Sequence, residues 1–178
     1  MRVISGKYKG KNLIGFDIDG TRPTMDRVKE SLFGIIQNYV KGSIVLDLFA
    51  GSGSLGIEAL SNGASSCYFF DNNMELVNII KKNTKDMNGV HIMKSDYKNS
   101  LELLKNSNIK FDIIFLDPPY KLNLINDCIN KIHECDLLSD DGIIVCEYEN
   151  ENIETDKYDL FKEKKYGSKN IKIYKCKI

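Results

Sequence analysis

Strand-like and helix-like segments alternate from residue 43 almost to the end of the chain, and this alternation constrains the fold more than any other feature of the sequence. Apolar runs of strand length recur five times, and segments with helical periodicity separate them. This order predicts a parallel sheet covered by helices on both faces. The five expected strands are SIVLDLFA (43–50), SSCYFFD (65–71), GVHIMKSD (89–96), FDIIFLD (111–117) and GIIVCEY (142–148).

The two ends of the chain depart from this alternation. Near the C-terminus, YDLFKEKKYG and NIKIYKCKI look like two adjacent strands joined at a glycine, which predicts an antiparallel hairpin. The first sixteen residues also predict a short hairpin, and a helix capped by Thr24 is expected to follow it. We therefore expect a single domain over residues 1–178, made of an N-terminal hairpin and helix (1–41) and an α/β core (42–178).

Composition places the chain among soluble globular proteins. Its 178 residues are 42% hydrophobic and 28% charged, which is ordinary for one domain with a substantial core. Five scattered cysteines without a C-x-x-C pair favour reduced thiols over a disulfide framework or a zinc site. The sequence shows neither an apolar leader nor a membrane-length apolar run, so we expect a cytoplasmic protein.

A net charge of zero conceals an uneven distribution of charge. Residues 1–41 carry eight Lys or Arg against four acids, and residues 157–178 carry eight against two. The stretch between them carries a net negative charge. Basic ends could form a local phosphate-binding face. The alternative is that these lysines simply coat solvated helices and strands.

A glycine-rich loop, DLFAGSGSLGIEAL, follows the first expected strand. Gly51, Gly53 and Gly56 fit the pattern G-x-G-x-x-G, which brings backbone amides and a helix N-terminus close to a ligand. The pattern alone is weak, because a tight strand-to-helix turn also needs glycine.

Acidic residues at the ends of three successive strands narrow the expected ligand. Asp47, Asp71 and Asp96 would line the crevice where open α/β sheets bind ligands. Carboxylates would repel the pyrophosphate of NAD, whereas a nucleoside with a positive charge would suit them. S-adenosylmethionine fits this description, with Asp47 toward its amino end, Asp71 on the ribose and Asp96 near the adenine. The alternative is that each Asp caps the helix that follows it.

The stretch FDIIFLDPPY ends an apolar strand on an acid, two prolines and a tyrosine. Proline fixes φ and has no N–H, so Pro118 and Pro119 predict a rigid extended turn. The turn would present the Asp117 carboxylate and the Pro118 carbonyl as paired acceptors beside the Tyr120 ring. Such a group suits a planar base with an exocyclic amine, held in line with a methyl donor. The alternative is a strand terminator with a buried tyrosine.

The pairing of DLFAGSG with DPPY resembles class I S-adenosylmethionine-dependent methyltransferases that modify amino groups. Together with MRVISGKYKGKNL, TRPTMDRVKESLF and KKYGSKNIKIY, it resembles the bacterial RsmD-type family over essentially the whole chain. The resemblance implies a Rossmann-like α/β fold, a seven-stranded sheet whose last strand is antiparallel. It also implies methylation of a guanine N2 amine in 16S ribosomal RNA, with ribosomal RNA or a small-subunit assembly particle as partner.

The expected site residues fall into three groups. Those expected at the transferred group are Asp117, Pro118, Pro119 and Tyr120. Those expected at S-adenosylmethionine are Asp47, Phe49, Gly51, Ser52, Gly53, Asp71, Asn72, Ser95 and Asp96. Those expected at RNA phosphates are Lys7, Lys9, Lys11, Arg22 and Arg27. We expect no metal and a monomer.

Two other functions remain open at this point. The DPPY turn also suits the N6 amine of adenine, so an adenine-N6 methyltransferase acting on DNA or RNA is the nearest alternative. A non-catalytic RNA-binding assembly factor on the same fold is the second, although the intact stretch from Asp117 to Tyr120 disfavours it. The position of Glu147 at the end of the fifth strand allows it to face the site, but the sequence assigns it no role.

Overall fold

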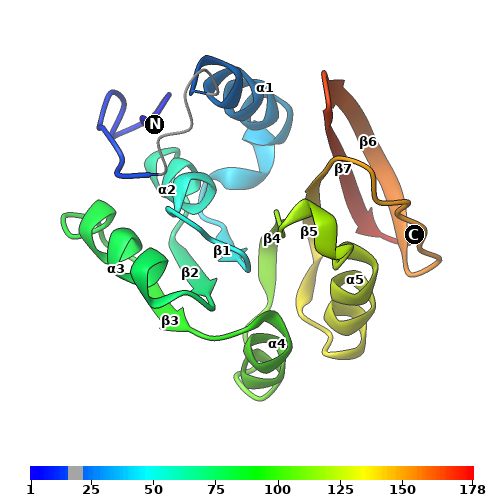
Figure 1. The fold of residues 1–178 in the computed structure, drawn as a ribbon. Coiled ribbons are helices and arrows are strands. Elements are labelled where there is room, and N and C mark those ends of the chain that lie inside the picture. The colour runs from blue at the N-terminus through cyan, green and yellow to red at the C-terminus, as the bar shows by residue number, and fades with distance from the viewer. Residues whose placement is uncertain (16–21) are drawn as a thin grey trace.

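A seven-stranded sheet forms the centre of the computed structural model (Figure 1). The structure describes residues 1–15 and 22–178, and for residues 22–24 it describes the backbone only. The strand order is β3-β2-β1-β4-β5-β7-β6. Strands β1 to β5 are parallel, and β7 runs antiparallel to both of its neighbours. This confirms the expected fold class. The strands are β1 (Ile44–Asp47), β2 (Ser66–Asp71), β3 (Val90–Lys94), β4 (Phe111–Leu116), β5 (Leu138–Tyr148), β6 (Tyr158–Tyr166) and β7 (Lys169–Cys176).

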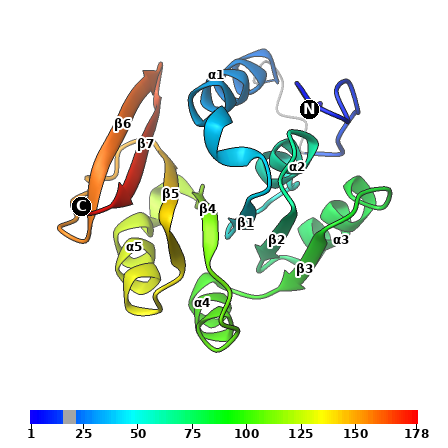
Figure 2. The same ribbon diagram turned by 180° about the vertical axis from the view of Figure 1, so that it is seen from behind.

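Helices cover both faces of the sheet, as the alternation predicts (Figures 1 and 2). One face packs against α1, α2 and α3 through a cluster that includes Leu32, Ile57 and Ile80. The other face packs against α4 and α5 through a cluster that includes Leu101 and Ile129. The α-helices are α1 (Arg22–Val40), α2 (Ser54–Ser61), α3 (Met74–Asn83), α4 (Tyr97–Lys105) and α5 (Ile125–Glu134).

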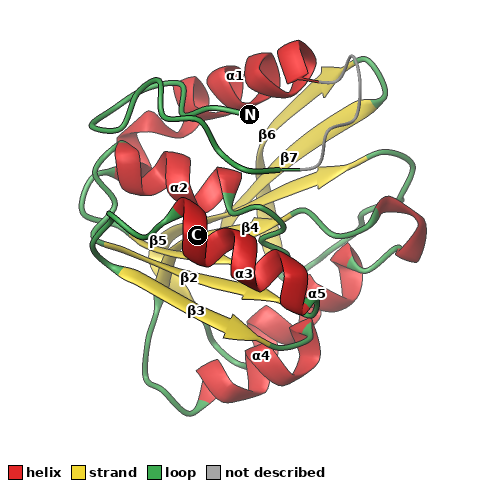
Figure 3. Cartoon of the chain, turned by 60° about the vertical axis from the view of Figure 1, so that its left-hand side comes forward, coloured by secondary structure: helices red, strands yellow, loops and turns green. Residues whose placement is uncertain are grey.

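The N-terminal segment is less regular than the expected hairpin. Its two arms form one antiparallel bridge, Arg2 with Asn12, and the backbone N–H of Val3 donates to the carbonyl of Lys11 over 2.9 Å. The loop packs on α2: Gly6 has φ 84°, and a Cβ there would lie 2.1 Å from the Ser61 carbonyl oxygen. Figure 3 shows the loop running past α1 and α2. The two arms therefore pair as an irregular hairpin, with further backbone bonds from Gly10 to Val3 and from Leu13 to Met1, and the loop between them also rests on α2.

The start of one helix and the start of one strand differ from expectation. Helix α1 begins at Arg22, so the prediction of Thr24 as its N-cap is wrong. Helix α5 ends at Glu134 because Asp136 adopts the left-handed conformation, with φ 52°, and β5 begins at Leu138, before the predicted position. The last residue of the expected N-terminal hairpin, Phe16, lies outside the described residues.

None of the helices in the described part of the chain is long and apolar enough to cross a membrane. The five cysteines all carry free thiols, and Cys67, Cys128 and Cys146 are buried.

Candidate active site

A cleft of about 600 Å³ lies where β1, β2, β3 and β4 end. We call it the strand-tip cleft. It is at the sheet edge where open α/β folds bind ligands, and its volume is typical of small-molecule sites. Its lining residues are Leu48, Phe49, Gly51, Asp71, Asn72, Asn73, Leu76, Ser95, Asp96, Tyr97, Asp117, Pro118, Pro119, Tyr120, Leu122 and Leu124.

The glycine loop makes the turn from β1 into α2. Gly53 is the N-cap of α2 with φ 85°, a conformation that residues with a side chain rarely adopt. Gly56 lies against the sheet, where an added Cβ would come within 2.4 Å of the Phe69 ring. The loop therefore needs glycine for its turn and for helix–strand packing, and Gly51 still lines the cleft.

Asp47 lies behind this loop and is almost fully buried, with 1% of its surface exposed. Its Oδ2 accepts the Gly56 backbone N–H over 3.1 Å. Burial raises the pKa of Asp47 to about 7, the Gly56 N–H opposes that rise, and the neighbouring Asp71 charge adds to it. Asp47, Ser52 and Gly53 are not among the residues that line the strand-tip cleft, so a role for Asp47 toward a ligand would act through the loop.

Asp96 caps the helix that follows it, as the alternative reading of the sequence allowed, whereas Asp71 supports the glycine loop and the N-cap of α3 is Asn73. Asp71 accepts the backbone N–H of Gly51 over 2.9 Å and that of Asn73 over 3.0 Å. Asp96 caps α4 by accepting the Asn99 N–H over 2.8 Å. Both residues also line the cleft, together with Asn72 and Ser95. Because each carboxylate oxygen can accept more than one hydrogen bond, capping leaves acceptors for a ligand.

The stretch from Asp117 to Tyr120 leaves β4 as an extended turn and then forms a short 3₁₀ helix, Tyr120–Leu122. Tyr120 donates its hydroxyl hydrogen to Glu147 Oε1 over 3.1 Å. Among the described residues, none donates a hydrogen bond to the Asp117 carboxylate. Burial raises the pKa of Asp117, the Glu147 charge raises it further, and Lys169 opposes the rise. The turn thus presents a carboxylate whose acceptor positions are open toward the cleft.

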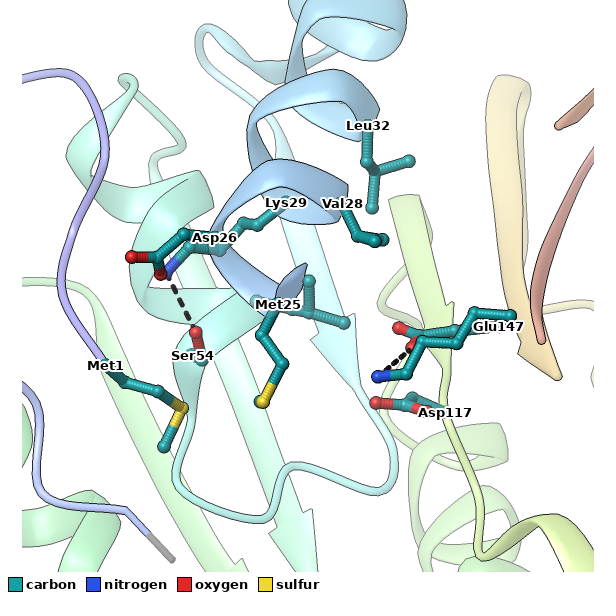
Figure 4. A pocket seen from close by; sticks show the side chains of 11 residues that line it. Met1, Met25, Asp26, Val28, Lys29, Leu32, Ser54, Asp117 and Glu147 are labelled. Carbon is teal, nitrogen blue, oxygen red and sulfur yellow. Dashed lines mark hydrogen bonds and ion pairs between the residues drawn. The ribbon is translucent and has the colours of Figure 1, made fainter. Parts of the chain in front are cut away.

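A second, smaller pocket of about 80 Å³ lies on the other side of Asp117 (Figure 4). We call it the helix-side pocket, because the N-terminal turns of α1 form one wall. Asp117 lines both cavities, so a ligand in each would meet at this carboxylate. The pocket is lined by Met1, Met25, Asp26, Val28, Lys29, Leu32, Ser54, Leu55, Asp117, Glu147 and Lys169.

Glu147 and Lys169 form an ion pair at one end of the helix-side pocket, with 3.3 Å between Lys169 Nζ and Glu147 Oε1. Glu147 comes from the end of β5, and Lys169 is the first residue of β7. The sequence indicated that Glu147 could face the site, but no signal connected it with Lys169, because the antiparallel pairing of β5 with β7 brings them together.

A buried ion pair that the sequence did not indicate supports the opposite wall. Lys29 of α1 lies 3.3 Å from Glu58 of α2, and burial lowers the pKa of Lys29 despite the Glu58 charge. Glu58 also accepts the backbone N–H groups of Ile4 and Ser5 over 2.9 and 3.0 Å. The pair therefore ties α1, α2 and the N-terminal segment together. The one sign of this pair in the sequence is that Glu58 is an acidic residue within the apolar helix α2.

Four of the expected RNA-binding residues, Lys7, Lys9, Lys11 and Arg27, are not among the residues that line either cavity. Lys7 and Lys9 are exposed in the N-terminal loop, where Lys7 Nζ is 5.4 Å and Lys11 Nζ 5.9 Å from the centre of the Tyr8 ring. Arg27 is exposed on α1, and the side chain of Arg22 lies outside the described residues. Their role in RNA binding stays a prediction.

No group of three or more His, Cys, Asp or Glu side chains within the described residues is arranged to hold a metal ion.

Comparison with known proteins identifies the family. The family model described as Conserved hypothetical protein 95 matches residues 1–175. YlbH of Bacillus subtilis is 40% identical over 98% of both chains. The Haemophilus influenzae protein named Ribosomal RNA small subunit methyltransferase D is 36% identical over 98% of this chain and 93% of its own length. The solved structure of yhhF from Escherichia coli superposes with a TM-score of 0.86 at 27% identity, over 99% of this chain and 98% of that one. The chain therefore belongs to the RsmD-type family, whose model bears the description Conserved hypothetical protein 95.

Proposed function

We propose that this protein methylates the exocyclic N2 amine of a guanine in small-subunit ribosomal RNA, with S-adenosylmethionine as the methyl donor. The observation that carries the proposal is the position of Asp117 in the wall shared by the two cavities. A relative of 36% identity bears the name of a small-subunit ribosomal RNA methyltransferase, which supports the choice of substrate.

The strand-tip cleft suits S-adenosylmethionine. Gly51 lets the ligand lie close to the main chain, and Asp71 and Asp96 offer free acceptor positions for ribose hydroxyls and for the adenine amine. Phe49, whose ring centre is 5.7 Å from that of Tyr97, adds an apolar surface for the base. When bound there, S-adenosylmethionine supplies a methyl group on a positively charged sulfur.

The chain's part in the transfer is to hold the amine in line with that methyl group. The Asp117 carboxylate and the Pro118 carbonyl accept the two N–H bonds, so that the nitrogen lone pair is free to form the new N–C bond while the C–S bond electrons leave with sulfur. The proton released by the nitrogen passes to Asp117, whose raised pKa favours accepting it. Tyr120, held by Glu147, stacks on the base.

The N-terminal segment and α1 are proposed to form an extension of the core that meets RNA. Lys7, Lys9 and Lys11 would contact phosphates around the target, with Tyr8 available for a stacked base. This role would explain why a buried ion pair, Lys29 with Glu58, fixes the segment against the core.

Mass mapping of small-subunit RNA from cells with and without the protein tests the proposal. We expect one guanine to lose 14 Da of mass in the deleted strain, and nuclease digestion to yield N2-methylguanosine only from cells with the protein. Purified protein with labelled S-adenosylmethionine should restore the mark on the unmethylated RNA or particle. N6-methyladenosine as the product would contradict the choice of guanine, and an unchanged RNA would contradict the function.

A further inference from the structure

We propose that Glu147 and Lys169 recognise guanine in the helix-side pocket, Glu147 by accepting the N1–H and Lys169 by donating to O6. The inference rests on the proposed function, because it assumes that Asp117 holds the N2 amine. It adds the residues that distinguish guanine from adenine, a choice that the Asp117–Tyr120 stretch alone leaves open.

The hydrogen-bonding edge of guanine presents two neighbouring donors, N2–H and N1–H, and one acceptor, O6. The charged wall of the pocket offers the complementary set: two carboxylates, Asp117 and Glu147, and one ammonium, Lys169. Adenine presents a single donor group and a bare N1 acceptor on that edge. With adenine in place, one of the two carboxylates would face a lone pair without a donor, which is unfavourable in a buried site.

Glu147 has an oxygen available for this contact. The Tyr120 hydroxyl and Lys169 Nζ both approach Oε1, at 3.1 and 3.3 Å. Among the described residues, none donates to Oε2. The side chain of Glu147 is only 11% exposed, and its contacts with Tyr120 and Lys169 hold its orientation before a base binds. Lys169 has three ammonium hydrogens, and its bond to Glu147 leaves others for O6.

The opposite wall suits the face of a base. Met25, Val28 and Leu32 of α1 line the pocket, and Figure 4 shows Met25 extending into the space between Met1 and Asp117. The pocket of about 80 Å³ is smaller than a purine, so Met1 and Met25 must turn aside when the base enters. Methionine is unbranched and has three rotatable side-chain bonds, which makes this movement cheap.

Base analogues at the target nucleotide test the inference. Small-subunit RNA is assembled by ligation with guanine, 2-aminopurine or 2,6-diaminopurine at the mapped position, and kcat/KM for methyl transfer is measured on each. Both analogues keep the N2 amine but lack the N1–H and O6. The wild-type protein should use guanine roughly 100-fold better than either analogue.

Two variants test whether Glu147 and Lys169 cause the preference for guanine over the analogues. Glu147→Gln can donate its amide hydrogens to the bare N1 of the analogues, so the preference for guanine should fall to about tenfold or less. Lys169→Met should lose the part of the preference that O6 provides. Each preference is a ratio measured within one variant, so partial unfolding does not alter it. Glu102→Gln and Lys105→Met, both on exposed positions of α4, serve as matched controls and should keep the wild-type ratio.

Equal use of guanine and 2-aminopurine by the wild-type protein would overturn the inference while leaving the proposed function intact. An unchanged preference in Glu147→Gln would overturn it as well. Failure to methylate any of the three RNAs, guanine included, would instead overturn the proposed function itself.

Discussion

The strand-tip cleft and the helix-side pocket meet at Asp117, but their walls are built in different ways. In the cleft, Asp71 and Asp96 accept backbone N–H groups within three residues or from the adjacent loop, at 2.9 and 2.8 Å. In the pocket, Glu147 contacts the side chains of Tyr120, from the 3₁₀ helix after β4, and Lys169, from β7. Backbone turns therefore shape one wall, and tertiary contacts between side chains shape the other.

This difference suggests a division of labour. Caps and turns hold their geometry whether or not a ligand is bound, which suits a cavity that takes the same cofactor in every cycle. Side-chain pairs can be altered one residue at a time, which suits a surface that chooses among bases. Substitutions in the two cavities should therefore have different effects on activity, ligand affinity and stability.

The largest effect is expected from Asp117→Ala, at the boundary between the two cavities. Losing the acceptor for the target amine should lower kcat/KM for methyl transfer by about 10³-fold, while the affinity for S-adenosylhomocysteine changes little. Labelled methyl transfer and calorimetry measure the two quantities. Asp140→Ala, an exposed acid on β5, is the matched control. Comparable losses in both quantities would show that Asp117 belongs to the cofactor side alone.

Asp47→Asn tests the cleft side through stability. The pKa of Asp47 is about 7 in the folded protein against an ordinary value of 3.8, so the folded state keeps a proton that the unfolded chain releases. Wild-type stability should therefore fall as pH rises from about 4 to about 7. The substitution removes this loss and should stabilise the protein at about pH 8 by up to roughly 4 kcal/mol, at about 1.4 kcal/mol for each pKa unit.

Urea unfolding at about pH 4.5 and about pH 8 measures this difference. If the Asp47 carboxylate contributes to ligand binding, Asp47→Asn should bind S-adenosylhomocysteine more weakly than the wild type does, although the variant is more stable. The same dependence of stability on pH in both proteins would refute the buried, proton-holding role of Asp47.

A slightly smaller effect is expected from Lys29→Met on the pocket side. The substitution leaves Glu58 buried without its cation, which should lower the free energy of unfolding by about 3 kcal/mol. Adding Glu58→Gln should recover part of this loss, because it removes the buried charge that has no cation, although the amide oxygen can then accept from only one of Ile4 and Ser5, which donate to different oxygens of Glu58. Chemical denaturation measures both. Lys41→Met, at an exposed position just after α1, is the control, and an equal effect there would contradict the role of the pair.

The two sides also differ in how far the sequence predicted them. The strand–helix alternation and the glycine loop predicted the sheet and brought Asp71 and Asp96 to one edge, because period and turn chemistry are local properties. The pairs Glu147–Lys169 and Lys29–Glu58 could not be predicted. Glu and Lys are common surface residues, and only the packed fold brings these members together.

The N-terminal segment also makes tertiary contacts that the local sequence did not predict. Its sequence has the turn residues of a hairpin, but the backbone of Ile4 and Ser5 donates to Glu58 of α2, and the backbone of Tyr8 donates to Ser61 Oγ. The local pattern predicted the pairing between the two arms, which the structure contains, but it gave no sign of the additional bonds from Ile4, Ser5 and Tyr8 to α2. A Thr24 N-cap would start the helix at residue 25, but α1 begins three residues earlier, at Arg22.

Because Asp117 lines both cavities, one small molecule could reach from one into the other. An adenosine unit joined through a short bridge to a 2-aminated purine would place each half in its own cavity. Binding of the first half would then hold the second at a high effective concentration. Because the two cavities share Asp117, this protein is a suitable target for bisubstrate inhibitors, which would occupy both cavities at once.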